Sequence, residues 1–142
     1  MRVDIRFIDE LGKPSTDYVE GFPVVDVLIE VGFERPADPN AAFTPQYVQT
    51  RALIDTGANY TIIRPDLAID KPQVSTTTAH SMLGQGYGSV HNALLEIVGF
   101  KPTVLEVATA PLKSVQIVLG RDMLSKYRMI YDPPNGVFYL EG

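Results

Sequence analysis

Apolar and polar residues alternate along several short segments of this chain, and this pattern predicts β-strands. Near the N-terminus Val3, Ile5 and Phe7 alternate with charged residues, and residues 24–31 are rich in β-branched side chains. Further strands are predicted at residues 47–54, 60–63, 74–82, 89–98, 103–108, 115–119, 128–131 and 137–140. Many short strands separated by frequent turns favour an all-β barrel or sandwich with little helix.

Proline and glycine residues mark the connections between these strands. Residues 33–45 contain three prolines and predict an exposed loop, and the glycine-rich residues 84–88 predict a turn. Helix is predicted only for one turn at residues 64–68 and for residues 121–127, where apolar side chains share a face. The sequence has no internal repeat or long linker, so residues 1–142 are expected to form a single domain.

The composition excludes several kinds of chemistry. The chain lacks cysteine, so it has no disulfide, thiolate metal site or cysteine nucleophile. A net charge of -5 without a basic cluster argues against nucleic-acid binding. No apolar run is long enough for a signal peptide or membrane span, so we expect a cytoplasmic protein without membrane association. His80 and His91 are expected to be exposed on strands and not to bind a metal.

Asp55 is the strongest candidate for chemistry, because it follows an apolar run and begins an Asp-Thr-Gly sequence. An ionised carboxylate at the end of a buried strand is costly unless it is hydrogen-bonded or paired. Gly57 has no side chain, so a ligand can approach the backbone closely there. Taken alone, these residues also fit an aspartate that caps an ordinary β-turn. The motif occurs once in the sequence.

The wider sequence around Asp55 resembles the aspartic proteases of the retroviral type, the retropepsins. Three segments in the correct order carry the resemblance. Residues 53–58 resemble the active-site signature and residues 82–88 the glycine-rich flap. The third segment, residues 95–99 followed by residues 117–124, resembles the second half of the domain.

The resemblance covers roughly residues 24–131 and implies the retropepsin fold. That fold is all-β, a closed β-barrel with one short C-terminal helix. Residues 1–21 are then an N-terminal extension of the core, and residues 128–141 are expected to form a C-terminal hairpin.

By resemblance, the chain is an aspartic endopeptidase. Two aspartate carboxylates within hydrogen-bonding distance cannot both ionise, so they share a proton. The ionised carboxylate takes a proton from the attacking water, and the protonated one donates to the scissile carbonyl oxygen. No metal or organic cofactor is implied. Because the motif occurs once, the second Asp55 must come from another copy, and we expect a homodimer that acts on a polypeptide.

The resemblance also assigns supporting roles. Thr56 would bond across the dimer axis, and Gly57 would offer its backbone to the substrate. The implied substrate-binding residues are Ala58, Asn59, Met82, Leu83, Gly84, Gln85, Gly86 and Tyr87, and the implied structural supports are Leu119, Gly120 and Arg121. The glycine-rich segment equally fits an ordinary flexible hairpin turn.

One departure from the retropepsin pattern keeps other functions open. Asn59 stands where the viral enzymes usually carry an aspartate that pairs with the arginine, here Arg121. An Asn–Arg hydrogen bond is weaker than a bidentate ion pair. A non-enzymatic dimeric module that binds peptides or acts as a scaffold on the same fold is therefore an alternative. A third interpretation is an unrelated β-barrel ligand binder in which Asp55 is structural.

Overall fold

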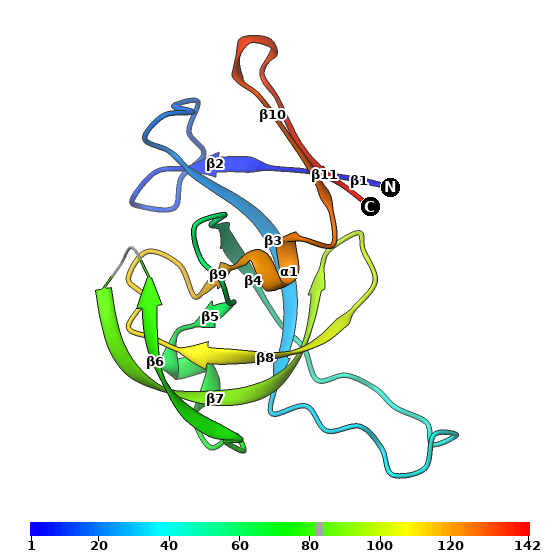
Figure 1. Cartoon of the computed structure of the whole chain (residues 1–142). Helices are drawn as coiled ribbons and strands as arrows, with labels where there is room; N and C mark the ends of the chain where they lie inside the picture. Colours follow the sequence, from blue (N-terminus) through cyan, green and yellow to red (C-terminus); the bar gives the residue numbers. More distant parts are fainter. Residues whose placement is uncertain (82–83) are drawn as a thin grey trace.

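The chain folds mainly into β-strands (Figure 1). The computed structural model describes the backbone of residues 1–81 and 84–142, and the side chains of these residues outside 76–87. The strands are β1 (Arg2–Asp4), β2 (Arg6–Ile8), β3 (Phe22–Val31), β4 (Val48–Ile54), β5 (Ile62–Ile63), β6 (Ser75–Ser81), β7 (Gly84–Ile97), β8 (Thr103–Thr109), β9 (Ile117–Leu119), β10 (Arg128–Asp132) and β11 (Val137–Glu141). The helical elements are the 3-10 turns η1 (Pro65–Ala68) and η2 (Pro133–Asn135) and the helix α1 (Arg121–Leu124). Within the described residues, none of these helices has the length and apolar character needed to cross a membrane.

Most strands belong to one sheet that closes on itself. The strand order is β2-β3-β4-β9-β5-β8-β7-β6, and an additional antiparallel pairing between β3 and β7 closes the sheet. Strands β3, β4, β9, β5, β8 and β7 therefore form a six-stranded barrel, with β2 and β6 attached outside it. The predicted all-β closed barrel with one short C-terminal helix is confirmed.

The barrel is closed by the long strand β3, which pairs with two different strands. Its residues pair with β4 over much of their length, and Val27 to Val31 also pair with β7. Buried side chains alternate along β3, so Val25, Val27 and Ile29 point into the barrel. They pack against apolar residues from the other strands, among them Ile63, Leu95, Ile97, Val107, Ile117 and Leu119. This continuous core makes the barrel one packing unit.

A second, smaller sheet joins the two ends of the chain. Its order is β1-β11-β10, and the N-terminal amine of Met1 donates a hydrogen bond to the carbonyl of Gly142 at 3.0 Å. An aromatic cluster packs this sheet onto the barrel. In it the ring of Phe138 lies 4.8 Å from that of Phe7 and 4.6 Å from that of Tyr18.

Two local predictions are wrong. The glycine-rich residues 84–88 were predicted to form a turn, but they begin strand β7, which pairs with β6 from Ser81 and Gly84 onward. The predicted helix at residues 121–127 ends at Leu124. The next backbone hydrogen bonds join Lys126 to Met123 and Tyr127 to Leu124, which is 3-10 spacing, before β10 begins.

We predict that the barrel core dominates stability, and β8 offers a matched comparison. Val107 is 1% exposed in the core, whereas Val104 on the same strand is 41% exposed. Val107→Ala should lower the free energy of unfolding by about 2 kcal/mol, because it removes buried methyl groups and leaves a cavity. Val104→Ala should cost less than about 1 kcal/mol. Urea unfolding followed by circular dichroism measures both, and equal losses would contradict this assignment of the core.

Candidate active site

The site begins where the chain crosses the end of β9. Strand β4 pairs with one side of β9 in parallel, and β5 pairs with the other side in antiparallel orientation. The connection from β4 to β5 must therefore pass over the C-terminal end of β9. Gly120 stands at that point, where a Cβ atom would lie 2.4 Å from the backbone carbon of Tyr60. The crossing is possible because Gly120 has no side chain.

Asp55 is the first residue of this connection. Its backbone N–H donates to the carbonyl of Leu119 at 3.1 Å, which extends the parallel ladder between β4 and β9 by one bond. Its carboxylate Oδ1 accepts a hydrogen bond from the N–H of Gly57 at 2.9 Å, and its carbonyl accepts one from Ala58 at 3.2 Å. The Asp55 side chain is half-buried, while Thr56 and Gly57 are exposed. The turn thus presents an oriented carboxylate at the surface of a rigid barrel.

A buried pair, Thr61 and Asp122, holds the far end of the connection. Thr61 is 0% exposed, and its hydroxyl donates to Oδ1 of Asp122 at 2.8 Å and accepts from the N–H of Gly120 at 3.3 Å. The Asp122 carboxylate also accepts from the backbone N–H groups of Thr61 at 3.0 Å and Met123 at 2.8 Å. These bonds fasten the start of β5 to the start of α1. Asp122 is therefore fully engaged in holding the loop.

Neither Thr61 nor Asp122 was among the residues predicted for the site. Their hydrogen bond joins residues 61 positions apart, so no local spacing points to it. The one available signal was an isolated threonine inside the apolar segment 60–63. A polar residue in a buried strand requires a hydrogen-bond partner, and the aspartate after Gly120-Arg121 was a candidate.

The residues after Gly57 divide into buried and exposed positions. Ala58 is 4% exposed and packs in a small apolar cluster with Ile62 and Val118. Its carbonyl accepts a hydrogen bond from the Arg121 N–H at 2.8 Å. In the single chain Ala58 thus anchors the turn to the barrel through its buried side chain, although its predicted role was substrate contact. Tyr60 is 69% exposed beside it.

Asn59 and Arg121 contact each other directly. The guanidinium Nη2 of Arg121 donates to the amide oxygen Oδ1 of Asn59, and the Asn59 carbonyl accepts from the N–H of Asp122 at 3.2 Å. The amide in place of a carboxylate therefore keeps the hydrogen bond but leaves the arginine charge without a counter-ion at this position. Leu119, Gly120 and Arg121, which were predicted as supports, each contact the 55–60 segment.

The start of β9 is also held by hydrogen bonds to its neighbours. Gln116 accepts a hydrogen bond from the hydroxyl of Thr50 at 2.6 Å, and its carbonyl accepts one from the N–H of Arg64 at 2.8 Å. The Arg64 guanidinium pairs with Asp66 at 2.6 Å, and this hydrogen-bonded ion pair lowers the pKa of Asp66 below its usual range. The strands flanking β9 are thus joined to it at both ends.

The predicted flap residues lie on the β6–β7 hairpin. Gly84, Gln85, Gly86 and Tyr87 form the beginning of β7 and pair with β6. Met82 and Leu83 lie outside the described residues. In Figure 1 the ends of β6 and β7 that flank the grey trace lie at the left of the barrel.

The histidine prediction needs a correction. His91 was expected to be exposed, but it is 3% exposed on β7. Its Nδ1 lies 2.6 Å from the carbonyl oxygen of Pro72, and its Nε2 lies 2.7 Å from the hydroxyl of Ser89. Both ring nitrogens are satisfied, so His91 ties the segment before β6 to β7. Among the residues that the structure describes, no group of three or more histidine or acidic side chains is placed to hold a metal ion.

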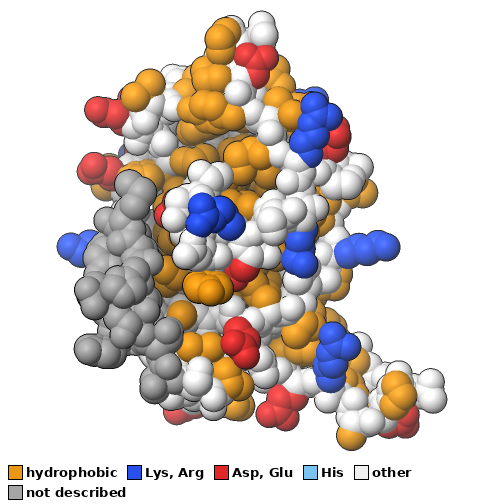
Figure 2. Space-filling model, viewed as in Figure 1, with side chains coloured by type: hydrophobic (Ala, Val, Ile, Leu, Met, Phe, Trp, Pro, Cys, Tyr) orange, Lys and Arg blue, Asp and Glu red, His pale blue; other side chains and the backbone are white. Residues whose placement is uncertain are grey.

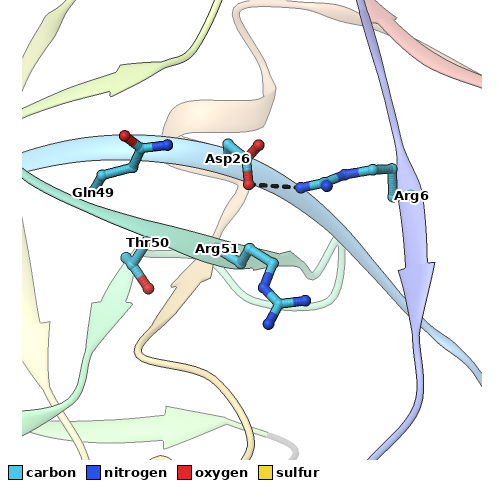
Figure 3. A pocket seen from close by; sticks show the side chains of 5 residues that line it. All are labelled: Arg6, Asp26, Gln49, Thr50 and Arg51. Carbon is cyan, nitrogen blue, oxygen red and sulfur yellow. Dashed lines mark hydrogen bonds and ion pairs between the residues drawn. The ribbon is translucent and has the colours of Figure 1, made fainter. Parts of the chain in front are cut away.

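A polar hollow of about 450 Å³ lies on the outer surface of β3 and β4 (Figure 3). Arg6 donates to Asp26 at 2.6 Å, and Nη1 of Arg51 donates to the carbonyl of Gly12 at 2.8 Å. In Figure 3 the Arg51 side chain points away from the Arg6–Asp26 pair. Both guanidinium groups make contacts within the chain. The Arg51 bond connects the turn at residues 9–13 to β4, the strand that precedes Asp55.

The barrel and the Asp55 connection define an acid-protease type of fold, and comparison with known proteins places the chain within it. Residues 21–130 match the retroviral aspartyl protease family. The match covers most of the chain, so the chain belongs to this family, as its resemblance to the retropepsins predicted. No curated protein sequence matches the chain significantly.

Two solved structures of the foamy viral protease-reverse transcriptase show the same fold, and a third foamy virus structure is similar. The foamy viral protease-reverse transcriptase with an RNA/DNA hybrid matches at 15% identity and a TM-score of 0.51, over 74% of this chain and 12% of that chain. The same enzyme type with double-stranded DNA matches at 15% identity and a TM-score of 0.53, over 76% and 16%. Simian foamy virus (mac) protease matches at 16% identity and a TM-score of 0.49, over 72% and 91%. The chain thus spans about an eighth of the first of these proteins.

We predict that Thr61 and Asp122 act as one unit. Asp122→Ala should lower the free energy of unfolding by about 3 kcal/mol, because a buried hydroxyl and two N–H groups lose their acceptor. Thr61→Val combined with Asp122→Ala should cost at least about 1 kcal/mol less than the sum of the single changes. Thermal unfolding of the four proteins measures this. As a control, Thr61→Val and Asp4→Ala should be additive, and additivity for Thr61 and Asp122 would contradict the prediction.

Proposed function

We propose that this chain is an aspartic endopeptidase that works as a homodimer, with one Asp55 from each copy. The observation that carries the proposal is the Asp55 turn itself. A half-buried carboxylate, oriented by the Gly57 N–H at 2.9 Å, lies at the end of a barrel strand beside two exposed residues. Membership of the retroviral aspartyl protease family supports the same conclusion.

A second copy is needed because one chain supplies one suitable carboxylate. Asp122 is the acidic residue hydrogen-bonded to the same loop, and its oxygens accept bonds from Thr61 and Met123. It therefore cannot act as the partner of Asp55. Two-fold symmetry places identical residues opposite each other at the axis, so two Asp55 carboxylates can meet there.

The chemistry follows from a proton shared by the two carboxylates. The ionised Asp55 removes a proton from a water molecule, whose oxygen forms a bond to the scissile carbonyl carbon. The protonated Asp55 of the other copy donates its proton to the carbonyl oxygen, which gives a neutral tetrahedral diol. When the C–N bond breaks, the nitrogen takes the proton of the protonated carboxyl. The ionised carboxylate removes a proton from a diol hydroxyl as the C=O bond re-forms, so the dyad again carries one proton. The proposed chemistry needs no metal or organic cofactor.

The proposed substrate is a polypeptide in an extended conformation. An extended peptide binds by adding a strand to exposed backbone, and the β6–β7 hairpin is the element we assign to that role. A hairpin of this kind closes over the substrate and excludes water from the reacting bond. The exposed Tyr60 and the Asn59–Arg121 pair flank the same turn and form the near wall of the proposed site.

The first prediction of this proposal concerns Asp55. Asp55→Asn should lower peptide cleavage at least about 10³-fold, because an amide can neither accept the proton of the water nor donate one to the carbonyl. The fold and the dimer should persist. Asp70→Asn is the matched control, since Asp70 is exposed with φ of 61°, a conformation that asparagine also tolerates. Cleavage of a fluorogenic peptide library measures both, and full activity in Asp55→Asn would refute the proposal.

A second prediction concerns pH. Cleavage should follow a bell-shaped pH profile whose two limbs belong to the pair of carboxylates and not to either residue. On the acid side both are protonated and no base remains, and on the alkaline side both are ionised and no acid remains. A statine-type transition-state analogue should inhibit at the optimum. A dimeric peptide-binding module without catalysis would show no hydrolysis at any pH.

A further inference from the structure

We propose that the outer edge of β10 is the seam between two copies of this chain, joined as an antiparallel β10–β10 pair. This inference rests on the homodimer proposed above and names the surface that forms it. In the part of the chain that the structure describes, β10 pairs only with β11, so its other edge is open. An open strand edge is a template for pairing with another chain.

The hydrogen bonds of β11 show which backbone groups of β10 face this edge. Phe138 accepts a hydrogen bond from the N–H of Ile5, and Gly142 bonds to Met1, so these β11 residues direct their backbone groups toward β1. Alternate residues face opposite sides in an antiparallel strand. Phe138 and Leu140 therefore do not bond to their partners on β10, which are Tyr131 and Met129. The N–H and C=O groups of Tyr131 and Met129 point outward.

Three registers would bring outward-facing groups opposite each other, and one uses the whole strand. Centring the pair on Ile130 places each Met129 opposite Tyr131 of the other copy, where each pair exchanges two hydrogen bonds. Shifting the centre to Tyr131 would place Pro133, which has no N–H, opposite Met129. Shifting it to Met129 would use Tyr127, which lies outside the strand.

The charges on β10 favour the register centred on Ile130. In this register Arg128 of each copy lies opposite Asp132 of the other, so two opposite-charge pairs form across the axis. Ile130 meets Ile130 at the axis. The Arg128 side chain is 72% exposed and lies 3.7 Å from Glu141, which leaves it accessible to a second carboxylate. Opposite signs at the two ends of one strand are self-complementary only in an antiparallel pair.

The proposed seam lies close along the chain to the residues that hold the half-site. Strand β10 follows α1 after three residues, and α1 begins with hydrogen bonds to Ala58 and Asn59. The barrel and the terminal sheet also share the aromatic contact of Phe7 with Phe138. Figure 2 shows apolar side chains gathered over the β10–β11 hairpin at the top of the molecule, where Tyr131 is 54% exposed. An axis at Ile130 would relate the two Asp55 turns by the same two-fold symmetry.

A charge-swap experiment tests the seam. Asp132→Arg and Arg128→Asp should each weaken the dimer about tenfold or more, because two like-charge pairs replace two opposite-charge pairs. The double variant Arg128→Asp/Asp132→Arg restores the pairing and should return the dissociation constant to within about threefold of the unaltered chain. Asp4→Arg, a reversal on the β1 edge of the same sheet, is the matched control and should leave the dissociation constant unchanged. Sedimentation equilibrium of the full chain measures all four.

Hydrogen exchange provides a second readout that does not depend on charge. In the dimer the amides of Met129 and Tyr131 should be protected, and dilution to monomer should release them. The Ile130 amide faces β11 and should stay protected in both states. Unprotected Met129 and Tyr131 amides in the dimer, unchanged dissociation constants in the charge variants, or a chain that is monomeric at all concentrations would each overturn the seam.

These measurements, combined with the peptide-cleavage assay, separate the seam from the proposed enzyme. If the chain cleaves peptides as a dimer but the charge variants do not change its dissociation constant, the seam is wrong and the endopeptidase proposal is unaffected. A dimer that follows the charge-swap pattern but cleaves no peptide would establish the seam and refute the endopeptidase.

Discussion

The position of β9 between β4 and β5 is the constraint on which the rest of the site depends. Because these two strands bond to opposite sides of β9, the chain between them must cross its end at close range. That crossing requires a residue without a side chain at Gly120 and places Asp55 at the edge of the barrel. The hydrogen bonds of Thr61, Asp122 and Arg121 hold the crossing in place. A backbone topology therefore orients the carboxylate before any substrate is present.

The proposed enzyme divides its work between the barrel and a second copy. The barrel supplies rigidity, because the strand before Asp55 and the strand beside it are buried on the core side. The second copy supplies the other carboxylate and half of the substrate cleft. Asn59 contributes less than an aspartate would, because its hydrogen bond to Arg121 lies within one chain and lacks the charge of an ion pair. For the proposed enzyme we infer that recognition of the substrate backbone depends more on the β6–β7 hairpin and on Tyr60.

Local patterns predicted most of the fold but only part of the site. β-Branched composition identified β3, alternation identified β4, and the apolar run before Asp55 marked the strand end, because side-chain type and periodicity report strand burial. The glycines at 84–88 were read as a turn since glycine weakens a strand, yet cross-strand pairing with β6 outweighs that preference. His91 gave no sign of burial, because its partner Pro72 lies 19 residues away. Thr61 and Asp122 were missed for the same reason.

The sequence separation of these contacts has a consequence for synthesis of the chain. The bonds that fix the Asp55 turn against the barrel and α1 come from residues 119–122, more than sixty positions downstream. A chain still emerging from the ribosome has made the Asp-Thr-Gly segment long before it has made β9 or α1, and domains complete their folding only when such distant strands are available. The local bond from Gly57 to the Asp55 carboxylate can form early, but the turn is fixed against β9 and α1 only after residues 119–122 have been translated.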